Sequence, residues 1–219
     1  ALKISYMNDI ANLCELVGAN IEDVAEGMKY DDRIGANFLR AGIGYGGSCF
    51  PKDTKALKYL AKQYGYTLKT VEAAVDVNTA QKTKLYKKAS DRLITFNGLK
   101  VAVLGLTFKP GTDDLREAPS LDNVELLLKQ GAKIYAYDPV GIDNFKKKYP
   151  DQIVYVNNAE DALKDANVCF IFTEWNEIKA IKPKIYKELM KTPLVYDGRN
   201  IYDLDDMKKA GVEYYSIGR

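Results

Sequence analysis

The stretch KVAVLG, residues 100–105, decides the fold of the second half of the chain. It is a short apolar run that ends at a glycine, which is typical of a strand buried on both faces of a parallel sheet. Similar runs, with helical segments between them, occupy residues 133–139, 153–156, 168–172, 194–196 and 213–215. The expected helices span residues 121–129, 159–163, 185–190 and 204–209. This alternation predicts an α/β unit with a doubly wound parallel sheet.

The first 95 residues have a helical period instead. The apolar stripe Ile4, Met7, Ile10, Cys14 and Val17 predicts an opening helix. Three further helices are expected at 21–28 after the cap Asn20, at 51–63 from Pro51, and at 67–93 after the cap Thr67. We therefore expect an all-helical unit, residues 1–95, joined by its long last helix to a Rossmann-like unit, residues 96–219.

Two features of the helical unit predict a partner subunit and a longer protein. The helix expected at 67–93 carries apolar positions on more than one face, which predicts a homodimer formed through this helix. The chain also opens in helical register, with neither a methionine nor a capping residue before Leu2. We expect it to begin inside a longer protein.

Composition excludes several classes of function. The 219 residues carry a net charge of +2, so no basic field indicates a nucleic-acid partner. No apolar run reaches membrane-spanning length and no secretory signal opens the chain, so we expect no membrane partner and a cytoplasmic location. Three cysteines without CxxC pairing and without any histidine predict no metal site.

The segment GYGGSCFPKD, residues 44–53, carries the strongest chemical signal. It places Cys49 in a glycine loop just before Pro51, which suits a first helical turn. The positive end of a helix dipole and the neighbouring Lys52 both favour the nucleophilic thiolate. Asp53 falls in the first turn and could act as a base or orient water. The alternative is a buried structural cysteine beside an ordinary helix start.

The other two cysteines read differently. Cys14 lies on an apolar helical stripe and Cys169 inside a strand-like run, so both are expected to be buried. Because the chain has no histidine, Ser-His and Cys-His dyads are excluded. Any covalent chemistry at Cys49 must then be activated by a helix end, a lysine or a carboxylate.

The chain has no convincing dinucleotide fingerprint. Gly42, Gly44 and Gly47 have the GxGxxG spacing, but no strand precedes them and Cys-Phe-Pro follows them. The loop at 106–116, after the first strand, lacks the motif as well. That loop offers the cations Lys109 and Arg116, which could bind phosphate where a parallel sheet takes its ligands. Arg199, after a later strand, favours anion binding over a merely solvated loop.

Four motifs together resemble the UDP-glucose/GDP-mannose 6-dehydrogenase family across the whole chain. They are GYGGSCFPKD at 44–53, VAVLGLTFKPGTDDLREAPS at 101–120, FTEW at 172–175 and YDGR at 196–199. The resemblance implies a three-part enzyme with an NAD-binding Rossmann domain, a helical central domain and a Rossmann-like domain for the nucleotide sugar. This chain resembles the second and third parts, so NAD would be bound mainly by the missing first part.

The resemblance also implies residue roles. Cys49 resembles the nucleophile of a four-electron oxidation of the sugar C6, through a thiohemiacetal and a thioester, and Asp53 the group that assists water or proton transfer. Lys52 and Arg116 resemble contacts to NAD. Arg33 resembles a residue that a dimer partner contributes to the neighbouring site. The residues that resemble substrate contacts are Phe38, Leu39, Arg40, Tyr45, Gly46, Phe108, Lys109 and Arg199.

The substrate that the resemblance favours is UDP-glucose, because phenylalanine follows Cys49 where GDP-mannose relatives usually have leucine. GDP-mannose and UDP-N-acetylhexosamine oxidation remain alternatives. A further alternative is a non-catalytic nucleotide-sugar binding module, against which the intact Cys49, Lys52 and Asp53 argue. A lysine and an asparagine that polarise the reacting oxygen in the family would fall before Ala1. The chain alone is therefore expected to bind substrate without oxidising it.

Overall fold

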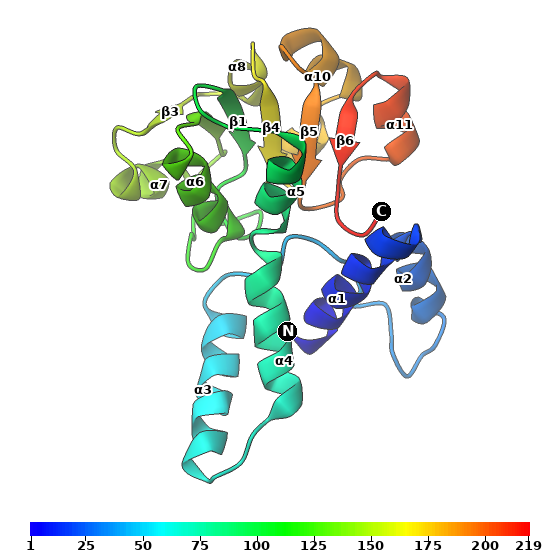
Figure 1. Cartoon of the computed structure of the whole chain (residues 1–219). Helices are drawn as coiled ribbons and strands as arrows, with labels where there is room; N and C mark the ends of the chain where they lie inside the picture. Colours follow the sequence, from blue (N-terminus) through cyan, green and yellow to red (C-terminus); the bar gives the residue numbers. More distant parts are fainter.

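A computed structural model describes all residues, 1–219, and contains the expected parallel sheet (Figure 1). Its six strands are hydrogen-bonded in the order β3-β2-β1-β4-β5-β6, and every pair is parallel. The strands are β1 (Lys100–Leu104), β2 (Lys133–Tyr137), β3 (Ile153–Tyr155), β4 (Val168–Ile171), β5 (Leu194–Asp197) and β6 (Glu213–Tyr215). The predicted α/β, doubly wound, Rossmann-like fold is confirmed.

The strand order places a switch point at the centre of the sheet. β1 pairs with β2 on one side and with β4 on the other, so Val101 lies between Ile134 and Val168. All four residues of β4 are buried, which explains their continuous apolar run. Because ligands of such sheets bind beyond the carboxyl ends of the strands, the segments after β1, β4 and β5 matter most.

Helices cover both faces of the sheet. They are α6 (Pro119–Lys129), α7 (Ile142–Lys148), α8 (Ala159–Leu163), α9 (Asn176–Lys179), α10 (Pro183–Leu189) and α11 (Leu204–Lys209). The sequence analysis missed α7 and α9. α7 buries only Phe145 and ends in three lysines, and α9 has one turn, so neither shows an apolar period.

The helical part contains α1 (Leu2–Val17), α2 (Ile21–Lys29), α3 (Cys49–Gln63), α4 (Lys69–Gln81) and α5 (Lys84–Arg92). Asn20 caps α2 as predicted, accepting a hydrogen bond from the Glu22 amide. Val17, expected on the buried stripe of α1, is exposed. In Figure 1 the hairpin of α3 and α4 projects away from the sheet, α1 lies beside α4, and α2 lies on the other side of α1.

The single long helix expected at 67–93 is wrong. The chain forms two helices that meet at Lys82 and Thr83, and α4 begins after Leu68 rather than Thr67. The Lys82 carbonyl accepts a hydrogen bond of 2.6 Å from the Asn123 side chain of α6, which diverts it at the break. Val75 and Val77 of α4 are half-buried, and the homodimer expected through this region stays a prediction.

The two parts share one hydrophobic core. A continuous cluster of buried side chains joins Met7 and Cys14 of α1, through Leu85 of α5, to Val101 and Phe170 in the sheet. Cys14 and Cys169 are buried and Cys49 is exposed, as expected. The boundary between residues 95 and 96 stays a prediction. None of the helices combines the length and the apolar character that crossing a membrane requires.

Candidate active site

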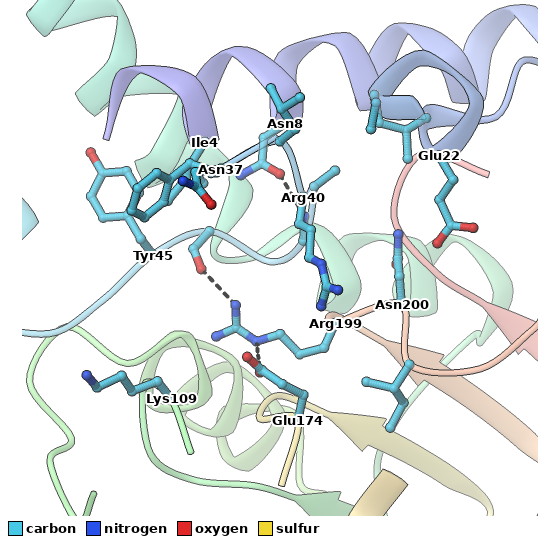
Figure 2. Close-up of a pocket in the computed structure, with 18 of the residues that line it drawn as sticks. Ile4, Asn8, Glu22, Asn37, Arg40, Tyr45, Lys109, Glu174, Arg199 and Asn200 are labelled. Carbon is cyan, nitrogen blue, oxygen red and sulfur yellow. Dashed lines mark hydrogen bonds and ion pairs between the residues drawn. The ribbon is translucent and has the colours of Figure 1, made fainter. Parts of the chain in front are cut away.

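A cavity of about 1150 Å³ opens between the helical part and the carboxyl ends of β4 and β5 (Figure 2). Its walls come from α1, α2, the segment 36–46 and the segments after β1, β4 and β5. Eight of the nine residues that the sequence suggested as substrate contacts line this one cavity: Phe38, Leu39, Arg40, Tyr45, Gly46, Phe108, Lys109 and Arg199. Arg33, the ninth, does not. Their binding role stays a prediction.

Arg199 is the central cation of this cavity. Its guanidinium donates hydrogen bonds to the carbonyls of Phe172 at 2.8 Å, Phe108 at 3.1 Å and Gly44 at 3.3 Å. It also forms an ion pair of 3.2 Å with Glu174 (Figure 2). One side chain thereby joins the glycine loop to the segments after β1 and β4. With 15% of its side chain exposed, Arg199 keeps part of its charge open to the cavity.

Asp197, the last residue of β5, fixes the backbone that carries Arg199. Its carboxylate accepts hydrogen bonds from the amides of Arg199 at 2.7 Å and Ile201 at 2.8 Å, and from the Tyr214 hydroxyl at 2.7 Å. Burial raises the pKa of the Asp197 carboxyl, and these hydrogen bonds oppose that rise by stabilising the charged form. Asp197 is a supporting residue that the sequence analysis did not identify.

Asp138, directly after β2, holds the loop that bears Phe108 and Lys109. Its side chain is almost completely buried. It accepts hydrogen bonds from the amides of Leu106 (2.7 Å), Thr107 (3.2 Å), Val140 (3.0 Å) and Gly141 (2.7 Å), and from the Trp175 indole (3.0 Å). In dinucleotide-binding sheets an acidic residue in this region contacts the ribose. Here the carboxylate is saturated by donors of its own chain.

Buried polar side chains hold the glycine loop on its helical side. Asn78 of α4 accepts from the Tyr45 amide at 2.8 Å and donates to the Tyr45 carbonyl at 3.1 Å. Asn8 of α1 accepts from the Gly42 amide, and Gln81 donates to the Gly42 carbonyl, both at 2.8 Å. Sequence reasoning missed all three. Their only signal was an amide side chain at a buried helical position, where it needs a partner.

The loop glycines permit close packing. A Cβ at Gly42 would lie 2.8 Å from the Gly198 carbonyl, and a Cβ at Gly47 would lie 2.7 Å from the Phe108 ring. Gly47 also has a φ of +82°, a conformation that suits glycine. These contacts account for the GxGxxG spacing without a phosphate. Together with the saturated Asp138, they give both the glycine spacing and the acidic residue a role within the fold of this chain.

Cys49 is the first residue of α3, two residues earlier than the helix start expected at Pro51. Its side chain is exposed and its Sγ lies 3.8 Å from the Ser48 hydroxyl. Cys49 does not itself line the cavity, but Gly46 and Phe50 on either side of it do. Cys49 is therefore a chain neighbour of the cavity lining, at the electropositive end of a helix.

Aromatic side chains form the wall beside this thiol. Phe50 meets Tyr45 edge-on at a centroid distance of 5.6 Å and Phe38 at 6.1 Å. Phe38 has a φ of 65°, an unusual value for a residue with a side chain. Burial raises the pKa of the Tyr45 hydroxyl. Phe38 is 59% exposed, so much of its apolar ring is open to solvent.

Asp53 and Lys52 follow Cys49 on the same helix. Asp53 is four residues beyond Cys49, a spacing that places both on one face of α3. Lys52 forms an ion pair of 3.4 Å with Asp53, and both side chains are largely exposed. Neither lines the cavity. Their assignment to proton transfer and to NAD stays a prediction.

Arg33 and Arg116 each form an ion pair with the aspartate two residues earlier in the chain. Asp31 accepts from the Arg33 amide at 2.9 Å and pairs with its guanidinium at 2.5 Å. Asp114 does the same for Arg116 at 2.9 Å and 2.7 Å. These hydrogen bonds lower the pKa of both aspartates. Both arginines remain mostly exposed and lie outside the large cavity.

Comparison with known proteins identifies both parts of the chain. The central domain of the UDP-glucose/GDP-mannose dehydrogenase family matches residues 1–80, and the UDP binding domain of the same family matches residues 102–204. The chain is 48% identical to UDP-glucose 6-dehydrogenase YwqF of Bacillus subtilis and 46% identical to UDP-glucose 6-dehydrogenase of Rhizobium meliloti. Each match covers the whole chain and 50% of the relative.

Solved structures agree with this assignment. A UDP-glucose dehydrogenase from Pyrobaculum islandicum superposes with a TM-score of 0.84 at 33% identity, over 97% of this chain and 46% of that one. An NDP-N-acetyl-D-galactosaminuronic acid dehydrogenase from Methanosarcina mazei gives 0.83 at 27% identity, over 100% of this chain and 48% of that one. The chain spans about half the length of the curated relatives it matches. It belongs to the UDP-glucose/GDP-mannose dehydrogenase family and comprises that family's central and UDP-binding domains.

Proposed function

We propose that this chain binds UDP-glucose and supplies the thiol for its oxidation to UDP-glucuronate, as part of an NAD-dependent UDP-glucose 6-dehydrogenase. One observation carries the proposal. Cys49, whose thiol is exposed, lies in the chain between Gly46 and Phe50, and both of these residues line the large cavity that also contains Lys109 and Arg199. A nucleotide sugar in this cavity would bring a sugar carbon within reach of a nucleophile at a helix N-terminus.

The diphosphate would bind to the cations of the sheet side. Lys109 is exposed at the cavity wall with its ammonium 5.4 Å from the Phe108 ring centroid, and Arg199 is held in place by three carbonyls. Arg40 adds a third positive charge from the helical side (Figure 2). Fixed guanidinium and ammonium groups suit a diphosphate, because they need little ordering when the ligand arrives.

The chemistry that we assign to Cys49 begins with the C6 aldehyde. The thiolate adds to the carbonyl carbon, a C–S bond forms, and the product is a thiohemiacetal. Its oxidation gives a thioester, which water cleaves to the carboxylate and the free thiolate. Asp53, on the same face of α3, takes the proton of that water. The same Cys49 returns unchanged, as a covalent catalyst must.

One NAD would accept the hydride released when the C6 alcohol becomes the aldehyde, and a second NAD the hydride released when the thiohemiacetal becomes the thioester. The GxGxxG spacing at residues 42–47 follows no strand, and Asp138, the acidic residue after β2, is saturated by donors of its own chain. What this chain could offer to NAD is limited to exposed cations, Lys52 and Arg116. We therefore expect the 219 residues alone to bind the nucleotide sugar and not to oxidise it.

UDP-glucose is the proposed substrate because the relatives described above, 48% and 46% identical, are UDP-glucose 6-dehydrogenases. Phe50, the residue after Cys49, also favours UDP-glucose. Its ring packs between Tyr45 and Phe38. GDP-mannose and UDP-N-acetylhexosamines are the alternative substrates. A non-catalytic binding module is the alternative function, and it would not need the exposed thiol of Cys49.

We also propose a homodimer, formed through the region 67–93 as the sequence predicts, with α1 as a further contact surface. Large apolar side chains are exposed along one side of α1: Leu2, Tyr6, Leu13, Leu16 and Val17. A helix side of this kind is typical of an interface. A symmetric partner would cover it, and Arg33, which lies outside its own cavity, could then reach the partner's site.

The binding step is tested by calorimetry with UDP-glucose. Lys109→Gln removes one exposed cation and should weaken binding by about tenfold, the value of one charge-assisted contact. Lys129→Gln is the matched control, since Lys129 is exposed and pairs with Glu125 on α6. Equal affinity in both variants would refute the assignment of the cavity.

A further inference from the structure

We propose that Glu117 is a positioning residue that holds the Cys49 loop against the nucleotide-sugar cavity. Glu117 lies in the segment between β1 and α6, far from Cys49 in the sequence and outside the cavity lining. The inference deepens the proposed function and rests on it, because the loop is worth positioning only if Cys49 is the reactive thiol.

The carboxylate of Glu117 joins three elements. It forms ion pairs of 2.7 Å with Lys55 of α3 and 2.7 Å with Lys82 at the end of α4. Hydrogen bonds from these two lysines lower the pKa of Glu117 to about 2. The Lys82 side chain is only 10% exposed, so this pair is shielded from solvent more than a surface pair. The segment after β1 is therefore tied to both helices of the projecting hairpin.

The backbone around Glu117 packs closely against the glycine loop. A Cβ at Gly46 would lie 2.4 Å from the Glu117 carbonyl oxygen, a distance that no side chain could tolerate. The Gly47 amide donates a hydrogen bond of 2.7 Å to the Arg116 carbonyl. Gly46 lines the cavity, and Cys49 begins α3 two residues after Gly47. The contact therefore lies directly between the cavity wall and the thiol.

Glu117 adopts a conformation that needs support. Its φ of 55° is in the left-handed region, which is unfavourable for a residue with a Cβ. Such strain persists only where surrounding contacts over-determine the backbone, and it gathers at functional sites. The two lysine pairs and the contact with Gly46 supply that support here. Loss of the carboxylate should relax this segment and release the loop from its place.

The prediction concerns placement of the thiol, so the test separates placement from binding and from reactivity. The probe is UDP-glucose in which a chloroacetamido group replaces the C6 hydroxyl. The Cys49 sulfur forms a bond to the probe carbon and chloride leaves. Three quantities are measured: the limiting labelling rate constant at saturating probe, the UDP affinity by calorimetry, and the rate of alkylation by iodoacetamide.

In Glu117→Gln we expect the limiting labelling rate constant to fall about 10- to 100-fold, the loss that a misplacement of about 1 Å causes. UDP affinity and the iodoacetamide rate should change less than about threefold, because neither depends on alignment between ligand and thiol. Glu125→Gln is the control, since Glu125 pairs with Lys129 on the surface of α6. Lys55→Gln, at a largely exposed lysine, gives a second and milder test with a several-fold fall expected.

Two results would overturn the inference alone: an unchanged labelling rate constant in Glu117→Gln and Lys55→Gln, or a parallel loss of UDP affinity, which a merely structural role would cause. Absence of Cys49 labelling in the unaltered protein would instead refute the proposed function, and the inference with it.

Discussion

Asp138→Asn should destabilise the protein more than its small chemical change suggests. The carboxylate is buried and accepts hydrogen bonds on both oxygens, from Leu106, Thr107 and Trp175 on one and from Val140 and Gly141 on the other. An asparagine must turn its NH₂ toward one of these groups of donors. Donor then faces donor, whichever way the amide is oriented.

The expected loss of stability follows from the smaller of the two groups of donors, the amides of Val140 and Gly141. At least two hydrogen bonds to a charged acceptor are lost, each worth about 1.5–3 kcal/mol, so we expect a loss of about 3–6 kcal/mol. That is a large share of the 5–15 kcal/mol typical of a folded domain. The loop after β1 carries Lys109, so UDP affinity should fall as well.

Urea denaturation of the two proteins measures this difference in the free energy of unfolding. The control is Asp143→Asn, the same chemical change at an exposed residue in the first turn of α7, for which we expect less than about 0.5 kcal/mol. A loss below about 1 kcal/mol in Asp138→Asn would refute the reasoning, because it would mean that the donors find other acceptors or water.

Iodoacetamide near neutral pH should modify Cys49 before Cys14 and Cys169, since only Cys49 is exposed, and peptide mass mapping identifies the modified thiol. Glu117 should stabilise the protein fully at pH values above 4.5, which is the pKa of the carboxyl in the unfolded chain. This contribution is lost as the pH falls toward about 2, the pKa of Glu117 in the folded protein. Urea titrations between pH 6 and pH 2 should therefore converge for Glu117→Gln and the unaltered protein. Light scattering should give about twice the 24.5 kDa of one chain, and Leu16→Glu should give a monomer.

The sheet was predictable from the sequence because each strand is a short apolar run with its own turn. The run at 100–105 gave β1 to within a residue, and the expected strand at 213–215 matches β6. The long helix at 67–93 was not resolved correctly, because its break depends on Asn123, a residue 41 positions away from Lys82. The apolar period of a local segment does not reveal such a hydrogen bond with a distant residue.

The site was predictable in part for a related reason. The residues proposed to contact the substrate belong to short local motifs, and eight of them meet at one cavity. Of the residues that hold those motifs in place, Asn78 and Asp138 lie outside the motifs, and Glu117 lies inside one without any sign of its role in the sequence. Each becomes evident only when the fold shows which amides or lysines surround it.

The most direct test of the proposed function is a titration of the 219 residues with UDP-glucose, GDP-mannose and NAD in the calorimeter. The cavity with Lys109 and Arg199 predicts that UDP-glucose binds. The similarity to UDP-glucose 6-dehydrogenases predicts weaker binding of GDP-mannose, and the lack of a dinucleotide fingerprint predicts no measurable binding of NAD. Micromolar affinity for NAD, or none for UDP-glucose, would contradict the division of roles proposed for this chain.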